Sequence, residues 1–228
     1  MEKLVYLVWG DKDCRREALR NKLLSALEPV QQQSRRLTLC VADDAVLPAE
    51  ALRQDCLRPS PDAFVHIWVD SAFRRAPLEQ ALHDTGLRFA GYLVTESEPL
   101  VVDRALERDT RVPGMCQTVC LTRPPRLSEE TFFDIWLNSH TQVAIDTQST
   151  FGYRQNVIAR PLTYGAPPLT AIIEENFPTE AMSSQHAFFD AADDDQLNSR
   201  QQAMIDSCVR FIDFDKIDVV PTSEYRLK

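Results

Sequence analysis

The sequence has little glycine and none of the glycine-rich motifs of nucleotide-binding proteins. Only 6 of its 228 residues are glycine, and neither GxGxxG, a P-loop nor GxSxG occurs. The first two motifs hold phosphate groups against backbone amides, and the third exposes a nucleophilic serine on a sharp turn. Their absence argues against dinucleotide, phosphate and serine-hydrolase chemistry.

Positive charge is also scarce. Lysine and arginine number 25 against 34 aspartate and glutamate residues, which gives a formal net charge of −9. Nucleic acids and anionic membranes are bound by basic surfaces, so neither is an expected partner. No apolar run approaches the roughly 20 residues of a membrane-spanning helix. No basic segment followed by an apolar block opens the chain, so no signal peptide is expected.

The cysteines do not form a recognisable metal or redox motif. None of the six belongs to a CxxC pair, and Cys116 and Cys120 stand four apart in a strand-like run. Zinc knuckles and redox centres need closer spacing with His or Cys partners. We therefore expect reduced cysteines scattered through the core of a cytoplasmic protein. A metal site at His140 would need two further carboxylates or histidines, and no spacing predicts one.

The first 98 residues predict the order β-α-β-β-α-β. Apolar, β-rich runs predict strands at 3–9, 37–42, 64–69 and 89–95. Helices are predicted from about Cys14 to Leu27, capped by Asp13 and ended by Pro29, and from Pro77 to about residue 83. Residues 43–61 look irregular, with one short helix at 48–56.

The second half repeats the order after a charged segment with one candidate helical turn, 98–113, which we interpret as a linker. Strands are predicted at 114–121, 151–160, 170–177 and 216–225. Helices are predicted at 127–147, with Ser128 as a weak cap, and at 196–211. The predicted units are thus residues 1–98 and 114–228, with 99–113 between them.

This order predicts an α+β fold made of two tandem ferredoxin-like units. One such unit leaves an apolar sheet face open, and a second unit can cover that face to form a barrel with its helices outside. The chain would then form within itself the arrangement that single units reach by dimerising. Two separate domains that each dimerise, and a further homodimer of the barrel, remain alternatives.

The helix at 127–147 carries the strongest chemical candidate. At 100° per residue, His140 lies in the middle of an apolar arc with Trp136 and Phe133 on either side, and Thr141 falls on the polar side. Such an imidazole either bonds to a neighbour as part of the core or lines a pocket as a general acid or base. Trp136 could stack on a ring-shaped ligand or simply pack in the core.

Residues elsewhere in the second half could complete such a site. Tyr153 and Tyr225 could hydrogen-bond a ligand or orient His140, and Glu174 and Glu224 could hold its tautomer, although residues of these types in such strands are more often ordinary strand residues. Arg154 and Arg123 are expected to form surface salt bridges. His66 alternates with Phe64 and Trp68 and is expected to serve packing.

Several of these segments resemble the EthD domain. The matching residues are Thr122-Arg123-Pro124, the Phe133-x-x-Trp136-x-x-x-His140 helix, Gly152-Tyr153, 171–177, 208–213 and 223–225. The resemblance covers roughly residues 114–228. The resemblance implies a ferredoxin-like, dimeric α/β-barrel protein. Relatives of that fold include cofactor-free monooxygenases, polyketide cyclases, lactone isomerases and haem-binding enzymes, so the fold alone does not choose a reaction.

The first half departs from the EthD pattern, because its helix has neither the tryptophan nor the histidine. We therefore expect one site per chain, in the second half. The leading hypothesis is a cofactor-independent enzyme that acts on a small apolar or aromatic molecule. In it His140 would be the acid or base, and Trp136, Phe133, Tyr153 and Tyr225 would bind the substrate. A non-enzymatic binding or structural barrel is the alternative, and haem ligation by His140 is a third.

Overall fold

The computed structural model describes residues 1–11, 15–56, 59–102 and 110–228. The predicted cap Asp13, the first residue Cys14 of the first predicted helix and most of the predicted helical turn before Pro113 lie outside these residues. Within the described chain no helix is long and apolar enough to cross a membrane.

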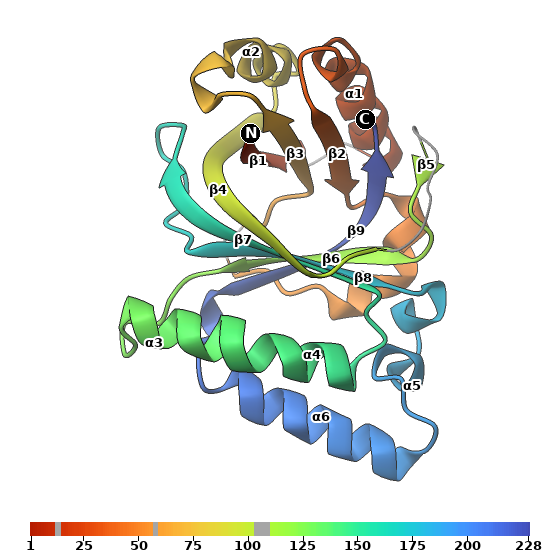
Figure 1. The fold of residues 1–228 in the computed structure, drawn as a ribbon. Helices are drawn as coiled ribbons and strands as arrows, with labels where there is room; N and C mark the ends of the chain where they lie inside the picture. The colour runs from red at the N-terminus through yellow and green to blue at the C-terminus, as the bar shows by residue number, and fades with distance from the viewer. Residues whose placement is uncertain (12–14, 57–58, 103–109) are drawn as a thin grey trace.

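In the part of the first half that the structure describes there are four strands, two α-helices and two short 3-10 helices, and the strands and α-helices follow the predicted order (Figure 1). The elements are β1 (Glu2–Trp9), α1 (Arg16–Gln31), β2 (Arg36–Val41), η1 (Asp44–Leu52), β3 (Ala63–Val69), η2 (Ala72–Arg74), α2 (Ala76–Asp84) and β4 (Arg88–Leu100). Strand β1 is a continuous apolar run because both of its faces are covered, and Leu4 and Val5 are each fully buried.

The second half repeats the pattern after the two-residue strand β5 (Thr110–Arg111). Its elements are β6 (Met115–Leu121), α3 (Glu129–Phe133), η3 (Asp134–His140), α4 (Thr141–Thr147), β7 (Gly152–Pro161), β8 (Ala171–Phe177), η4 (Thr179–Met182), α5 (Gln185–Phe188), α6 (Asp194–Cys208), η5 (Phe214–Lys216) and β9 (Ile217–Arg226). Gly114 opens this half with a φ of +89°. A Cβ there would lie 1.9 Å from the carbonyl oxygen of Phe177, so only glycine fits.

The strands close into one antiparallel barrel. Hydrogen bonding gives the order β2-β3-β1-β4-β7-β8-β6-β9, and β9 pairs back onto β2. Within each half the four strands have the ferredoxin-like order, second-third-first-fourth. The halves join at β4–β7, where Thr95 pairs with Val157, and at β2–β9, where Cys40 pairs with Glu224. The predicted α+β fold with an intramolecular α/β barrel is therefore confirmed.

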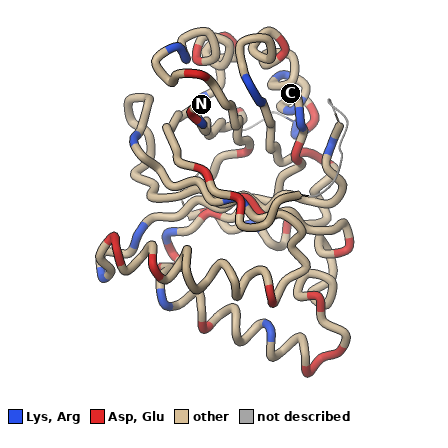
Figure 2. Tube along the Cα trace, in the orientation of Figure 1, with Lys and Arg blue, Asp and Glu red and all other residues tan. Residues whose placement is uncertain are grey.

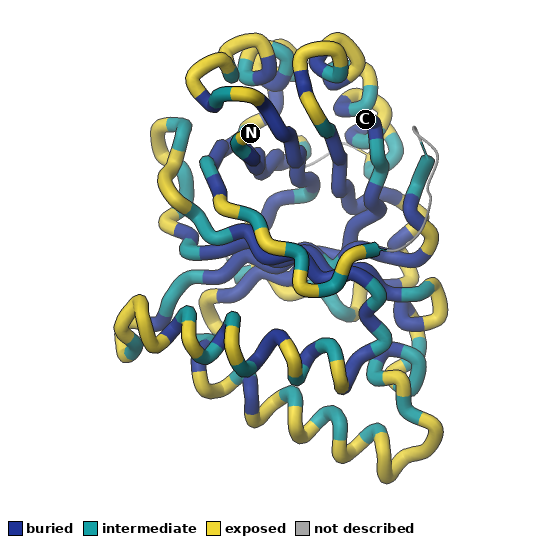
Figure 3. The backbone as a smooth tube through the Cα atoms, viewed as in Figure 1, coloured by how far each residue is buried: buried dark blue, intermediate teal, exposed yellow. Residues whose placement is uncertain are grey.

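Helices cover the barrel on two opposite sides (Figure 1). Leucines of α1 and α2, such as Leu23 and Leu82, pack on the outer face of the first-half strands. Phe132 and Phe211 close the corresponding core of the second half, where α3, η3, α4 and α6 lie on the sheet. Figure 3 shows the barrel walls buried, whereas most of α6 is exposed or half-buried. Helix α6 thus presents much of its surface to solvent.

Three elements differ from their sequence-based bounds. Helix α1 does not end at Pro29 but continues for about half a turn to Gln31. The side chain of Val30 is buried in the core, and its packing stabilises this last half-turn. The short helix predicted at 48–56 is a 3-10 helix, η1, which begins four residues earlier behind the cap Asp43. Strand β4 runs on to Leu100, into the segment predicted as a linker, because it pairs with β7 at the junction of the halves.

Charged side chains fill part of the barrel interior. Figure 2 marks the positions of charged residues along the chain, some of which lie in the central strands. An eight-stranded barrel is just wide enough for side chains to fill it. Arg154 is 2% exposed, and its guanidinium pairs with Glu174 at 2.9 Å and with Glu224 at 2.5 Å. The prediction of a surface salt bridge for Arg154 is therefore wrong, because β7 turns this side chain inward. Burial alone would raise the pKa of Glu224, but Arg154 lowers it to about 2.

We expect Arg154→Met to destabilise the protein by about 3–5 kcal/mol, because two buried carboxylates, Glu174 and Glu224, lose the cation that contacts both of them. Denaturant unfolding monitored by circular dichroism measures the loss. Arg35→Met is the control, since Arg35 pairs with Asp70 on the surface, where both side chains are about two-thirds exposed. Equal shifts of the unfolding midpoint in the two variants would contradict a structural role for the interior pairs.

Candidate active site

The helix that carries His140 contains a π-helical segment, η3. Phe132, Trp136, His140 and Ala144 are buried at steps of four residues. In a regular α-helix each such step rotates by about 40°, so Ala144 would face about 120° away from Phe132. The wider turn of η3, in which the amide of Thr141 bonds to the carbonyl of Trp136, keeps these side chains on the sheet side.

The wide turn also changes the position of Thr141. The regular helix places this residue on the polar side, but Thr141 is 5% exposed and accepts a hydrogen bond of 2.7 Å from the Gln155 side chain on β7. Its hydroxyl donates to the carbonyl of Trp136 at 2.8 Å. The segment η3 is therefore tied to the sheet by a polar contact that helical periodicity does not predict. Such π-helical turns occur often at functional sites.

A cavity of about 150 Å³ lies between this helix, α6 and the outer face of the second-half sheet. Apolar side chains make up much of its wall, and the exposed residues Gln54 and Phe214 lie at its rim. Its polar lining is small and is drawn from several elements: Gln117, His140, Gln148, Tyr153 and Glu175. A mainly apolar cavity with a few convergent polar groups is typical of a small-molecule site.

His140 is buried at the cavity wall with its ring held from two sides. Its Nδ1 lies 2.9 Å from the hydroxyl of Ser207 on α6, and its ring packs on Phe211 with 4.6 Å between centroids. Among the described residues Nε2 has no hydrogen-bond partner. Burial, followed by the nearby charge of Arg210, lowers the pKa of His140 to about 4. The imidazole is therefore neutral at pH 7.

Glu175 is the second titratable group of the cavity. The residue is 7% exposed, and burial raises the pKa of its carboxyl to about 7, an effect that a hydrogen bond with Gln117 reduces. A carboxyl group with this pKa is present in both protonation states near neutrality, which is the condition for proton transfer in either direction. Glu175 and His140 thus place two differently tuned proton-transfer groups at one cavity.

The aromatic residues predicted for the site lie together but play different parts. Tyr153 lines the cavity, and its hydroxyl accepts a hydrogen bond of 3.4 Å from the indole N–H of Trp136. Trp136 is fully buried behind Tyr153, and Phe133 packs against Trp136 with 6.2 Å between centroids. Trp136 and Phe133 therefore support the wall and do not form the cavity lining.

Tyr225 is not part of this group. Its hydroxyl lies 2.5 Å from the Asp43 carboxylate, and its ring packs against the core of the first half. Glu174 and Glu224 also point away from His140, because their side chains lie on the interior face of the barrel. In the first half, the corresponding layer between sheet and helices is packed with aliphatic side chains of the described residues, such as Leu19 and Leu78.

Glu175 was the site residue that sequence reasoning missed. Consecutive residues of a strand face opposite sides, so Glu174 and Glu175 must point into two different environments. The seven residues of β8 are all buried. Two adjacent glutamates in a strand that is buried on both faces therefore indicate that one carboxyl group lies inside the barrel and the other lies beneath the helices. The sequence alone does not show which side faces the cavity.

The two cavity groups predict opposite pH dependences of stability. Glu175 releases its proton near pH 4.5 when unfolded and near pH 7 when folded, so stability falls as pH rises through this window, by on the order of 3 kcal/mol. Glu175→Gln should remove this loss. The free energy of unfolding of the variant, relative to that of the wild type, should therefore be higher at pH 8 than at pH 4.5. Urea unfolding at the two pH values measures it.

His140→Gln serves as the comparison, with the opposite sign. The pKa of His140 is lowered on folding, so the wild type loses stability as pH falls from about 6.5 through 4. The free energy of unfolding of His140→Gln, relative to that of the wild type, should therefore be higher at pH 4.5 than at pH 8. A pH-independent difference between Glu175→Gln and the wild type would show that Glu175 has an ordinary pKa.

No family model and no curated protein matches the chain. Solved structures resemble it in fold. An anthrone oxidase-like protein superposes with a TM-score of 0.59 at 9% identity, over 99% of this chain and 93% of the other. Two proteins described as "putative monooxygenase" cover the whole chain. The one from Fusobacterium nucleatum subsp. nucleatum has a TM-score of 0.48, 12% identity and 92% of its own chain covered. The one from Lactobacillus acidophilus has a TM-score of 0.47, 9% identity and 94% covered.

At such low identity the comparison with the anthrone oxidase-like protein establishes the α/β-barrel architecture, and the likeness extends over nearly the full length of both chains. The chain therefore shares its fold with that protein, and its chemistry has to be argued from its own cavity.

Proposed function

We propose that the cavity binds a small, mainly apolar molecule and catalyses proton transfer at a carbon next to a carbonyl group, without a cofactor. The observation that carries this proposal is the placement of His140 and Glu175 on one mainly apolar cavity. Their environments hold one group neutral and the other near its titration midpoint at pH 7. Groups tuned apart in this way are typical of acid–base sites.

The roles follow from the two protonation states. The Glu175 carboxylate accepts the proton from carbon, and negative charge develops on the carbonyl oxygen of the substrate. With the Ser207 hydroxyl donating to Nδ1, His140 carries its proton on Nε2 and donates a hydrogen bond to that oxygen. The enolate then takes the proton back from Glu175 at another carbon, or attacks a second carbonyl of the substrate to close a ring while the new alkoxide takes the proton, or expels a leaving group from the β carbon, or adds dioxygen and takes the proton as a hydroperoxide.

The volume of the cavity limits its ligand. A cavity of about 150 Å³ accommodates one benzene-sized ring. The proposed substrate is therefore a single-ring or comparably small enolisable compound, and a fused-ring substrate would require α6 to move outward. Haem has four pyrrole rings, so the volume gives the haem alternative no support.

The Trp136-x-x-x-His140 helix is the feature that supports membership of the EthD family. A further homodimer of the barrel stays a prediction.

A non-enzymatic binding barrel is the second candidate. The bond from Ser207 to His140 and the packing of the imidazole on Phe211 favour it, because a purely structural histidine would be held in the same way. Proton-transfer activity separates the two candidates, since a binding barrel needs none.

Ligand binding should depend on the free volume beside α6. Met204 lines the cavity, whereas its neighbour Ile205 is about half exposed on the other side of the helix. We expect single-ring ketones and phenols to raise the melting temperature of the wild type and of Ile205→Trp, and not of Met204→Trp, whose side chain fills the cavity. A thermal-shift screen measures this. Equal shifts in both variants would place the binding site elsewhere.

Catalysis should depend on Glu175. For a ketone found in that screen, we expect the wild type to accelerate exchange of the α-hydrogen with deuterium, followed by NMR. Glu175→Gln should slow the exchange by about 10²-fold or more, and Glu130→Gln, a change on the exposed first turn of α3, should not. Ligand binding without accelerated exchange in the wild type would favour the binding barrel.

A further inference from the structure

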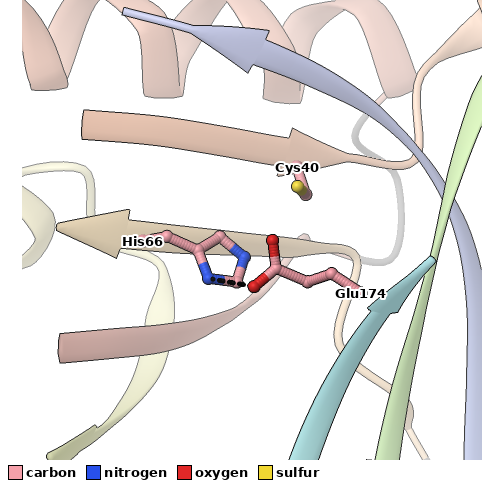
Figure 4. Close-up of side chains that lie close together, drawn as sticks. All are labelled: Cys40, His66 and Glu174. Carbon is pink, nitrogen blue, oxygen red and sulfur yellow. Dashed lines mark ion pairs between the residues drawn. The ribbon is translucent and has the colours of Figure 1, made fainter. Parts of the chain in front are cut away.

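The inside of the barrel holds a second cluster of reactive side chains, separate from the cavity beneath the helices. Cys40 on β2, His66 on β3 and Glu174 on β8 converge from opposite parts of the wall (Figure 4). Their sulfur, nitrogen and oxygen donor atoms all lie within 4.8 Å of one another, and all three residues are buried. A thiol, an imidazole and a carboxylate form a donor set suited to zinc.

His66 supplies independent evidence for a missing ligand. It is completely buried, yet neither ring nitrogen makes a hydrogen bond to a described residue. Its Nδ1 lies 3.2 Å from Glu174 in an ion-pair contact that would need a charged ring. A buried imidazole whose two nitrogens make no hydrogen bond costs free energy, and a ring nitrogen with a free lone pair is a metal ligand.

A second sulfur lies beside the cluster. Cys116 on β6 is a near neighbour of Cys40 and is also fully buried. It lies outside the group of three donor atoms within 4.8 Å of one another, so it is a candidate fourth ligand that would have to move toward them. Four is the coordination number of structural zinc sites.

We propose that Cys40, His66 and Glu174 bind one thiophilic divalent cation, such as Zn²⁺, inside the barrel. Cys116 completes the tetrahedron. Bonds of 2.0–2.3 Å place tetrahedral ligands about 3.4–3.8 Å apart. The separations among the Cys40, His66 and Glu174 donor atoms, at most 4.8 Å, therefore need to contract by up to about 1 Å, within the reach of side-chain rotation, and the Cys116 sulfur has to turn toward them.

The charge balance of the interior allows this exchange. The cation replaces the thiol protons of Cys40 and Cys116, which leave to solvent, so a charge of +2 enters as two protons depart. The net charge of the group of side chains beside Lys3 and Arg154 is therefore unchanged. Lys3 keeps its contact of 2.6 Å with Glu96 when Glu174 turns toward the metal. Because protons are released, affinity should rise with pH.

The position of the site also defines how it is filled. All four ligands are buried inside a closed barrel, so the cation is taken up as the chain folds and not by diffusion into the folded protein. The ligands come from both halves of the chain. The bound cation would therefore fasten β2 and β3 of the first half to β6 and β8 of the second, independently of the cavity that holds His140.

The test refolds the full chain from denaturant with Zn²⁺ or Co²⁺ and measures bound metal by mass spectrometry after desalting. We expect about one equivalent per chain, a thiolate-to-cobalt charge-transfer band, and a higher unfolding midpoint than after refolding with a chelator. Cys40→Ser should bind at least 10-fold more weakly. Cys120→Ser, which changes another buried cysteine of the interior, should bind as the wild type does.

X-ray absorption at the zinc edge keeps the proposal testable even where Cys40→Ser does not fold, because it uses the wild-type protein. Sulfur scatterers at about 2.3 Å together with nitrogen or oxygen at about 2.0–2.1 Å are expected. The proposal is overturned by a refolded wild type that retains less than about a tenth of an equivalent, by a zinc shell without sulfur, or by equal binding in folded Cys40→Ser.

Discussion

Charged side chains inside a closed barrel of eight strands must be neutralised by one another, because the interior has no room for bulk water. Glu174 is the residue on which this requirement converges. It pairs with Arg154 from the neighbouring strand β7, and across the barrel with Lys3 from β1, whose ammonium lies 3.0 Å away. A carboxylate without those cations would be very costly at that position. The pairing therefore requires the two halves of the chain to close on each other in one register.

Closure determines where chemistry can take place. The interior is filled with side chains, so the free volume of the second half lies outside the barrel wall, beneath α4 and α6. The adjacent residues Glu174 and Glu175 show how one strand serves both regions. The first carboxyl is held ionised among cations, and the second is desolvated among apolar side chains, which brings its pKa close to neutrality. The alternation of a β-strand thus separates an interior charge from a candidate base by one residue.

Much of the architecture could be predicted from the sequence, because it depends on local patterns. Both four-strand sets, the main helices and the cap at Ser128 follow from apolar periodicity and capping chemistry. The placement of His140 on the buried side of its helix followed in the same way. The inward position of Thr141 and the length of β4 could not be predicted, because a π-helical turn in one case and pairing between the halves in the other override local preference.

The sequence by itself determined the order of elements, the apolar faces and the single histidine on the second-half helix, because each is a property of consecutive residues. Only the tertiary structure decided which polar residues meet. Tyr225 lies beside Asp43 and not beside His140, and Arg154 and His66 turn into the barrel. The physical reason is that partners of buried polar groups are chosen by barrel closure, which brings together strands more than a hundred residues apart. His140 and Glu175 line one cavity because the helix layer of the second half packs on the outer face of its own sheet.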